Sequence, residues 1–132
     1  MESGANPALA VICLCAEWCG TCRDYRLGFE GLRKEFPTVT FRWVDIEDQA
    51  DAIGDLDVEN FPTLLIARSD VILFFGTMLP HLGHLRRAVE TFLAQPEAES
   101  LAYVSSSPER KAWQNDADLR NLAATRDESE IG

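Results

Sequence analysis

Hydrophobic residues follow two different spacings in the first part of the chain, and the change between them predicts a strand followed by a helix. Residues 8–16 form a continuous apolar run, which is typical of a strand buried on both faces. Beyond this run, apolar residues recur three and four positions apart, at Cys22, Tyr25, Phe29, Leu32 and Phe36. This spacing predicts one face of a helix that ends before Pro37.

The rest of the pattern predicts a small mixed sheet. It indicates a strand over residues 39–46 and a short acidic stretch with weak helical character over residues 47–56. A hairpin of two strands over residues 64–75 and a last helix over residues 82–95 follow. The resulting order is β-α-β-α-β-β-α. A strand–helix–strand unit gives a parallel pair with a right-handed crossover, and the hairpin adds antiparallel strands. We therefore expect an α/β fold with a central mixed sheet of about four strands and helices on both faces.

The composition changes after Pro96, so we divide the chain into a domain over residues 1–95 and an acidic extension over residues 96–132. The extension carries 8 acidic and 4 basic side chains. Residues 105–108 are a linker and a possible helix start. Trp113, Leu119 and Leu122 predict one weak amphipathic helix, and residues 126–132 are expected to be disordered.

Charge and hydropathy exclude some classes of partner. The chain of 132 residues has a net charge of −10, which repels phosphate backbones and anionic lipids, so we expect neither a nucleic-acid nor a membrane partner. The apolar run at residues 8–16 is too short to span a bilayer. It also lacks the preceding basic residues of a secretory signal, so we expect a cytoplasmic protein.

All four cysteines lie within residues 13–22, which indicates a local redox or metal site and not a disulfide scaffold. Four thiolates could hold zinc or an iron–sulfur cluster, but two from a strand and two from a helix start would need a connecting loop that the sequence lacks, so we expect no metal. Cys13 and Cys15 are interpreted as buried core thiols on one face of the strand. A regulatory disulfide between Cys13 and Cys22 remains an alternative.

The segment from Trp18 to Cys22 carries the candidate chemistry, because it lies where the strand gives way to the helix. A helix N-terminus stabilises a thiolate, which is the nucleophile in disulfide exchange. The spacing in Cys19-Gly20-Thr21-Cys22 then brings the second sulfur within reach of the first. We expect Cys19 to be the exposed attacking thiol and Cys22 the buried thiol that resolves the mixed disulfide.

Residues 16–22, Ala-Glu-Trp-Cys-Gly-Thr-Cys, resemble the active-site motif of the thioredoxin family, and Phe61-Pro62-Thr63 is a second match. The resemblance covers about residues 8–95 and implies a thioredoxin-like fold and a thiol–disulfide oxidoreductase, acting through catalytic Cys19 and Cys22 without a bound cofactor. It implies that Pro62 follows a cis peptide bond beside the cysteines. The residues expected to contact the substrate are Trp18, Gly20, Thr21, Phe61 and Pro62. The implied partners are protein disulfides and an electron donor such as a reductase, and we expect a monomer.

The sequence also departs from the family pattern. Cys13 stands where thioredoxins have a buried Asp that helps to move a proton off the resolving thiol, and Trp43 stands where its Lys partner is usual. The first strand and helix of the family have no counterpart in this sequence. The loss of the Asp and the added acidic extension favour an alternative hypothesis, in which the fold is a binding module or assembly factor with little redox turnover.

Overall fold

The computed structural model describes residues 9–16, 19–48, 61–68 and 71–124. Its centre is a sheet of four strands in the order β2-β1-β3-β4. The strands are β1 (Leu9–Cys15), β2 (Thr40–Asp45), β3 (Thr63–Arg68) and β4 (Val71–Thr77). β1 is parallel to β2 and antiparallel to β3, and β3 is antiparallel to β4. The predicted mixed sheet and its closing hairpin are thus confirmed.

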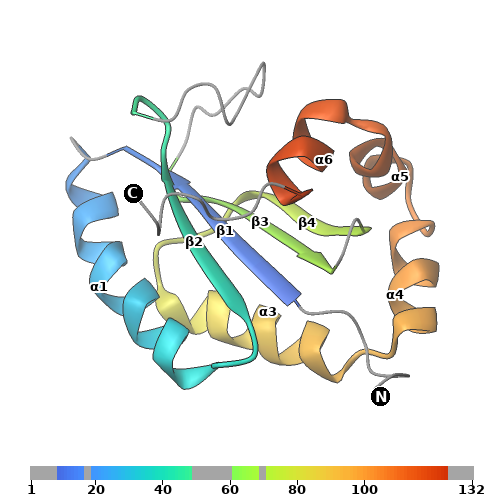
Figure 1. Ribbon diagram of the computed structural model, residues 1–132, viewed down its shortest axis with the longest axis horizontal. Helices are drawn as coiled ribbons and strands as arrows, with labels where there is room; N and C mark the ends of the chain where they lie inside the picture. The colour runs from blue at the N-terminus through green and yellow to red at the C-terminus, as the bar shows by residue number, and fades with distance from the viewer. Residues whose placement is uncertain (1–8, 17–18, 49–60, 69–70, 125–132) are drawn as a thin grey trace.

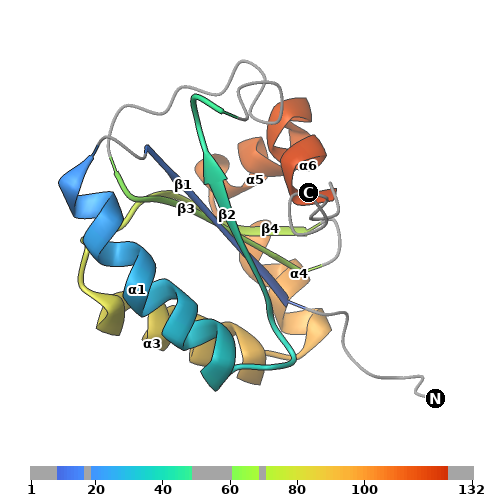
Figure 2. The same ribbon diagram turned by 60° about the vertical axis from the view of Figure 1, so that its left-hand side comes forward.

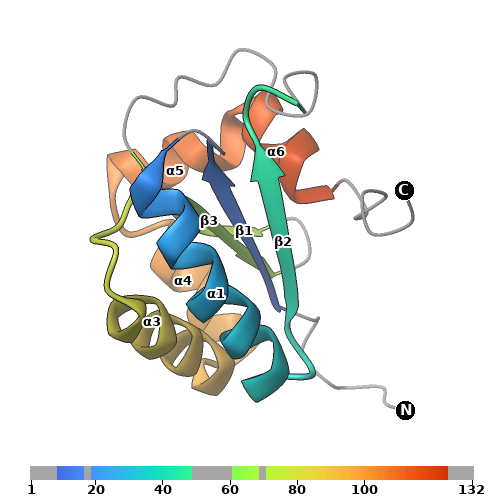
Figure 3. The same cartoon turned by 90° about the vertical axis from the view of Figure 1, so that its left-hand side faces the viewer.

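Two helices cover the first face of the sheet, α1 (Gly20–Glu35) and α3 (Leu82–Ala94), and they run side by side in Figures 1 and 3. Side chains alternate along β1, because successive residues of a strand point to opposite faces. Val11, Cys13 and Cys15 therefore pack into the core under α1 and α3, whereas Ile12 and Leu14 belong to the core on the second face.

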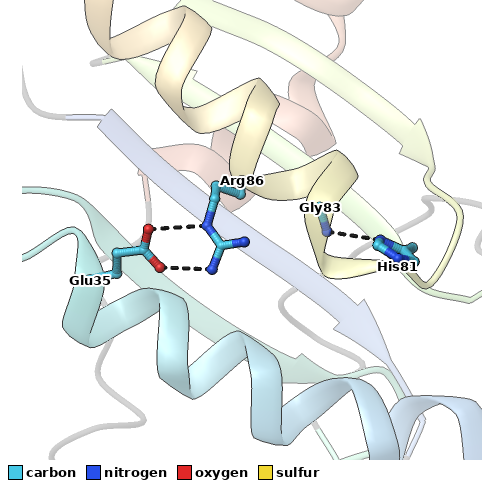
Figure 4. A network of polar contacts seen from close by, with 4 residues as sticks. All are labelled: Glu35, His81, Gly83 and Arg86. Atoms are coloured by element: carbon cyan, nitrogen blue, oxygen red, sulfur yellow. Dashed lines mark hydrogen bonds and ion pairs between the residues drawn. The ribbon is translucent and has the colours of Figure 1, made fainter.

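α1 and α3 approach each other closely, and one glycine makes this possible. A Cβ atom added at Gly28 would lie 2.7 Å from Cγ of Leu82, so a side chain at this position would force Leu82 to shift. Further along α1, two nitrogens of the Arg86 guanidinium, Nε and Nη2, donate to the carboxylate of Glu35 at 3.0 and 2.9 Å (Figure 4). The hydrogen bond with Arg86 lowers the pKa of Glu35.

Three short helices follow, where the sequence predicts only one. They are α4 (Glu97–Val104), α5 (Pro108–Asn115) and α6 (Ala117–Ala124), and Figures 1 and 2 show α5 and α6 on the side of the sheet opposite α1. The predicted helix start at residues 105–108 is confirmed, because the Ser107 hydroxyl accepts from the Arg110 N–H and caps α5. α4 went unpredicted because Ser100 and Val104 are its only two buried residues, too few for a helical spacing to show.

Helix α6 contributes to the hydrophobic core. Leu119 and Leu122 are 1% and 0% exposed and pack with Ile12, Leu14 and Leu65 on the second face. The division at residue 95 stays a prediction, but the described part of the extension, residues 97–124, is folded against the sheet. The expected disorder of residues 126–132 concerns a segment outside the described residues, as does most of the acidic stretch at residues 47–56.

A buried arginine fastens the extension to the end of β3. Arg68 is 3% exposed, and its guanidinium donates to the carbonyl oxygens of Phe92 and Gln95 and to the Ser100 hydroxyl. The Phe92 carbonyl also accepts from the Gln95 N–H, so Arg68 adds a side-chain donor at the C-terminal end of α3.

Candidate active site

Three segments that carry the predicted site residues meet at one end of the sheet. β1 ends at Cys15, and α1 begins at Gly20, only five residues later in the chain. The antiparallel register pairs Leu14 of β1 with Thr63 of β3, so Pro62 precedes β3 at the same end. The sheet therefore brings the cysteine segment and Pro62 to a common edge.

The start of α1 presents one cysteine to solvent and buries the other. Cys19 is the N-cap residue, with extended backbone angles and a half-buried side chain, and its carbonyl oxygen accepts from the Arg23 N–H at 3.1 Å. Gly20 and Thr21 are exposed, and Cys22 is 0% exposed. The side chain of Cys19 thus lies beside the first turn of α1, at the positive end of the helix dipole.

The disulfide in the structure joins Cys22 to Cys15, and Cys19 is a free thiol. The interpretation of Cys15 as a core thiol is therefore wrong, although both Cys15 and Cys22 are completely buried. The Cα atoms of the bonded pair are 5.9 Å apart, within the usual range for a disulfide. Alternation along β1 places Cys15 on the face that α1 covers, at the strand end nearest to the first turn of that helix.

Cys13 is the second free thiol, and its position explains why it is not the partner of Cys22. It lies two residues before Cys15 on the same face of β1, which is about 6.6 Å further from the strand end. It is 0% exposed, as expected of a core thiol. Burial raises the pKa of Cys13 far above the ordinary thiol value, against a smaller opposing effect of the Arg26 charge.

Tyr25 is the aromatic neighbour of this buried thiol. Its pKa is also raised, first by burial and then by the nearby Cys13. The Tyr25 hydroxyl is buried and finds no hydrogen-bond partner among the described residues. The Cys13 thiol and the Tyr25 hydroxyl, both in the first-face core beside the candidate site, are therefore difficult to deprotonate.

The remaining predicted site residues lie around this end of the sheet. The Phe61–Pro62 peptide bond is cis, as the family resemblance implies, and Phe61 packs against the first-face core. Trp18 lies outside the described residues. Trp43 is half-buried, packs edge-on against Phe29 with ring centroids 5.5 Å apart, and carries the Arg26 guanidinium 5.2 Å above its ring. It is a packing residue, as its place in a strand indicates.

The two histidines of the chain, His81 and His84, lie at the start of α3. His81 caps α3, where its Nδ1 accepts from the Gly83 N–H at 3.2 Å (Figure 4), and its ring contacts that of His84. In the described part of the chain, no group of three or more His, Cys, Asp or Glu residues is placed to hold a metal ion. The same residues include no helix that is both long and apolar enough to cross a bilayer.

Comparison with known proteins points to one family. Residues 4–74 match the family model described as thioredoxin. The chain is 33% identical over 61 residues to a thioredoxin from Ophiophagus hannah, covering 46% of this chain and 58% of that protein. It is 34% identical over 65 residues to thioredoxin H-type 2 from Nicotiana tabacum, covering 49% and 55%. The chain therefore spans little more than half the length of these curated relatives.

Solved structures agree with the sequence matches. The structure of Fasciola hepatica thioredoxin superposes with a TM-score of 0.60 at 27% identity, over 65% of this chain and 82% of that one. Thioredoxin from Trypanosoma brucei brucei gives a TM-score of 0.59 at 31% identity, over 67% and 77%. About a third of the present chain lies outside these superpositions.

Proposed function

The chain belongs to the thioredoxin family, and from this premise we propose that it is a thiol–disulfide oxidoreductase that reduces protein disulfides through Cys19 and Cys22. The observation that carries the proposal is the arrangement at the start of α1. The free thiol of Cys19 is partly exposed at the N-cap, and Cys22 is buried one turn further on. An accessible nucleophile followed by a protected second thiol is what a two-step exchange requires.

In the proposed cycle the Cys19 thiolate attacks one sulfur of a substrate disulfide, and the other substrate sulfur leaves as a thiolate. Cys22, as a free thiol, loses its proton and attacks the Cys19 sulfur, which releases the second substrate thiolate. The resulting Cys19–Cys22 disulfide is reduced by a dithiol donor such as a reductase. Cys22 is bonded to Cys15 in the structure, so the cycle requires that bond to be open.

The exposed neighbours of Cys19 would form the contact surface for the substrate chain. Gly20 and Thr21 are exposed beside it, and the cis Phe61–Pro62 pair lies at the same end of the sheet. Trp18 completes the proposed set by its position in the sequence. Net flow toward substrate reduction would follow from a reducing compartment, for which we propose the cytoplasm.

Insulin reduction in the presence of dithiothreitol tests the proposal. We expect turnover by the full chain, and loss of turnover in both Cys19→Ser and Cys22→Ser. Incubated with a disulfide substrate without dithiothreitol, reduced Cys22→Ser should also accumulate a mixed disulfide, because the first attack remains possible, whereas Cys19→Ser should not. Cys13→Ala is the matched control, since it removes a thiol from the same ten-residue segment without touching the proposed pair. Turnover that survives Cys19→Ser would overturn the mechanism.

A second candidate function is a binding module with little turnover, and the environment of Cys13 favours it. Cys13 stands at the position of the family's proton-moving Asp, and its raised pKa keeps it protonated at neutral pH. It therefore cannot accept the proton of the resolving thiol. A binding module would show no insulin turnover in the full chain, and Cys19→Ser would keep both its partner and its biological role.

A further inference from the structure

We propose that Cys15 is a third redox cysteine, which exchanges with Cys19 as the disulfide partner of Cys22. The proposal rests on the function proposed above, in which Cys22 also bonds to Cys19. Three observations place all three sulfurs in one exchange system. Cys22 is bonded to Cys15, both are completely buried, and Cys19 is a free, partly exposed thiol only three residues from Cys22.

The backbone around Cys15 holds its side chain in position for this exchange. Cys15 is the last residue of the central strand β1, and its carbonyl oxygen accepts from the Ile46 N–H at 2.9 Å. The next residue, Ala16, donates its N–H to the sulfur of Cys22 at 3.4 Å. The sulfur of Cys22 is therefore held between the end of β1 and the first turn of α1, within bonding reach of Cys15.

The exchange is an internal rearrangement that needs no oxidant or reductant. The Cys15 thiolate attacks the Cys22 sulfur of the Cys19–Cys22 disulfide. The Cys15–Cys22 bond forms, the Cys19–Cys22 bond breaks, and the electron pair leaves on the sulfur of Cys19. The proton that Cys15 gives up passes to solvent. The chain holds one disulfide before and after the step, so the ratio of the two isomers does not depend on the redox buffer.

The two isomers differ in what they can do to a substrate. The Cys19–Cys22 isomer is the oxidised end product of a turnover. The Cys15–Cys22 isomer presents Cys19 as a nucleophile but has no free resolving thiol. Its attack on a protein disulfide gives a mixed disulfide that persists until the Cys15–Cys22 bond is reduced. Exchange at Cys15 thus converts a reductase into a covalent holder of its substrate.

Disulfide mapping can distinguish the isomers because Glu17 separates the cysteines into two pairs. Cleavage after glutamate releases one fragment with Cys13 and Cys15 and another with Cys19 and Cys22. A Cys15–Cys22 disulfide joins the two fragments, whereas a Cys19–Cys22 disulfide lies within the second one. In the full chain oxidised in a glutathione buffer, we expect the joined fragments to be in excess. Finding only second fragments with an internal Cys19–Cys22 disulfide would overturn the proposal.

Variants identify the partner directly. Cys19→Ser, which cannot form the Cys19–Cys22 bond, is expected to oxidise to the joined fragments in the same buffer. Adding Cys15→Ser should abolish this disulfide, and adding Cys13→Ala instead should leave it intact. Three free thiols in Cys19→Ser, or a disulfide lost on changing Cys13, would overturn the proposal. Joined fragments without any insulin turnover would refute the proposed function alone, and turnover without joined fragments would refute only the role of Cys15.

Discussion

The side-chain amide of Gln114 makes a pair of hydrogen bonds to the backbone of Ile72. The Ile72 N–H donates to Oε1 at 2.8 Å, and Nε2 donates to the Ile72 carbonyl oxygen at 2.7 Å. β4 is an outer strand of the sheet, so its outward-facing backbone groups would otherwise need water or another strand. Gln114 of α5 therefore takes the place of a neighbouring strand at this position and ties the C-terminal extension to the sheet.

Gln114→Ala is expected to lower the free energy of unfolding by about 1–3 kcal/mol, because it leaves both Ile72 backbone groups without their partner. Urea denaturation followed by circular dichroism measures the change. Asn115→Ala is the control on the same helix, since Asn115 is exposed and its side-chain amide donates to the Lys111 carbonyl one turn back. Equal stability of the two variants would show that the amide pair contributes nothing.

Leu119→Ala and Leu122→Ala are each expected to destabilise the protein by about 2–5 kcal/mol, because they leave cavities in the core on the second face. The control is Leu101→Ala in α4, where the side chain is 49% exposed, and its cost should fall below about 1 kcal/mol.

The same reasoning predicts that a chain ending at residue 95 loses the native thermal transition. A truncated chain of unchanged stability would show that α6 is not required by the core.

The sequence predicts the sheet well because each strand has its own local signal. The continuous apolar run before Cys19, the helical spacing from Cys22, and the hairpin residues all depend on neighbours close in the chain. The packing of helices on the second face has no such local signal. α6 buries only Leu119 and Leu122, and its burial depends on contacts with Ile12 and Leu65, which are far away in the sequence.

The site shows the same division. The helix start, the partly exposed Cys19, the buried Cys22 and the cis bond before Pro62 follow from the motif and its family resemblance. The disulfide partner of Cys22 does not follow from the motif, because Cys13 and Cys15 share one face of the strand. Which of them reaches α1 is set by how far along β1 the first turn of the helix lies, and sequence spacing does not give this position.

Gly28 and Gly31 are predicted to respond in opposite ways to the same substitution. Both lie inside α1, where Ala is favoured over Gly by about 1 kcal/mol. A Cβ at Gly31 would meet nothing within 4 Å, so Gly31→Ala should stabilise the protein by about that amount. A Cβ at Gly28 would collide with Leu82, so Gly28→Ala should destabilise it by about 1 kcal/mol or more. Thermal denaturation of both variants gives the comparison, and a gain at Gly28 would show that α3 moves away freely.

The buried thiol of Cys13 predicts how stability depends on alkaline pH. In the unfolded chain this thiol loses its proton above a pH of about 8.5, but burial raises its pKa in the folded state. The folded state then binds the proton more tightly, so the contribution of Cys13 to the free energy of unfolding is complete below pH 8 and is lost as the pH rises.

The reduced protein should lose about 2 kcal/mol more stability between pH 8 and pH 10 than Cys13→Ala does. Urea denaturation with a phosphine reductant measures both curves. Parallel curves would mean that Cys13 ionises normally in the folded state, and it could then accept the proton of a neighbouring thiol, as the family's Asp does.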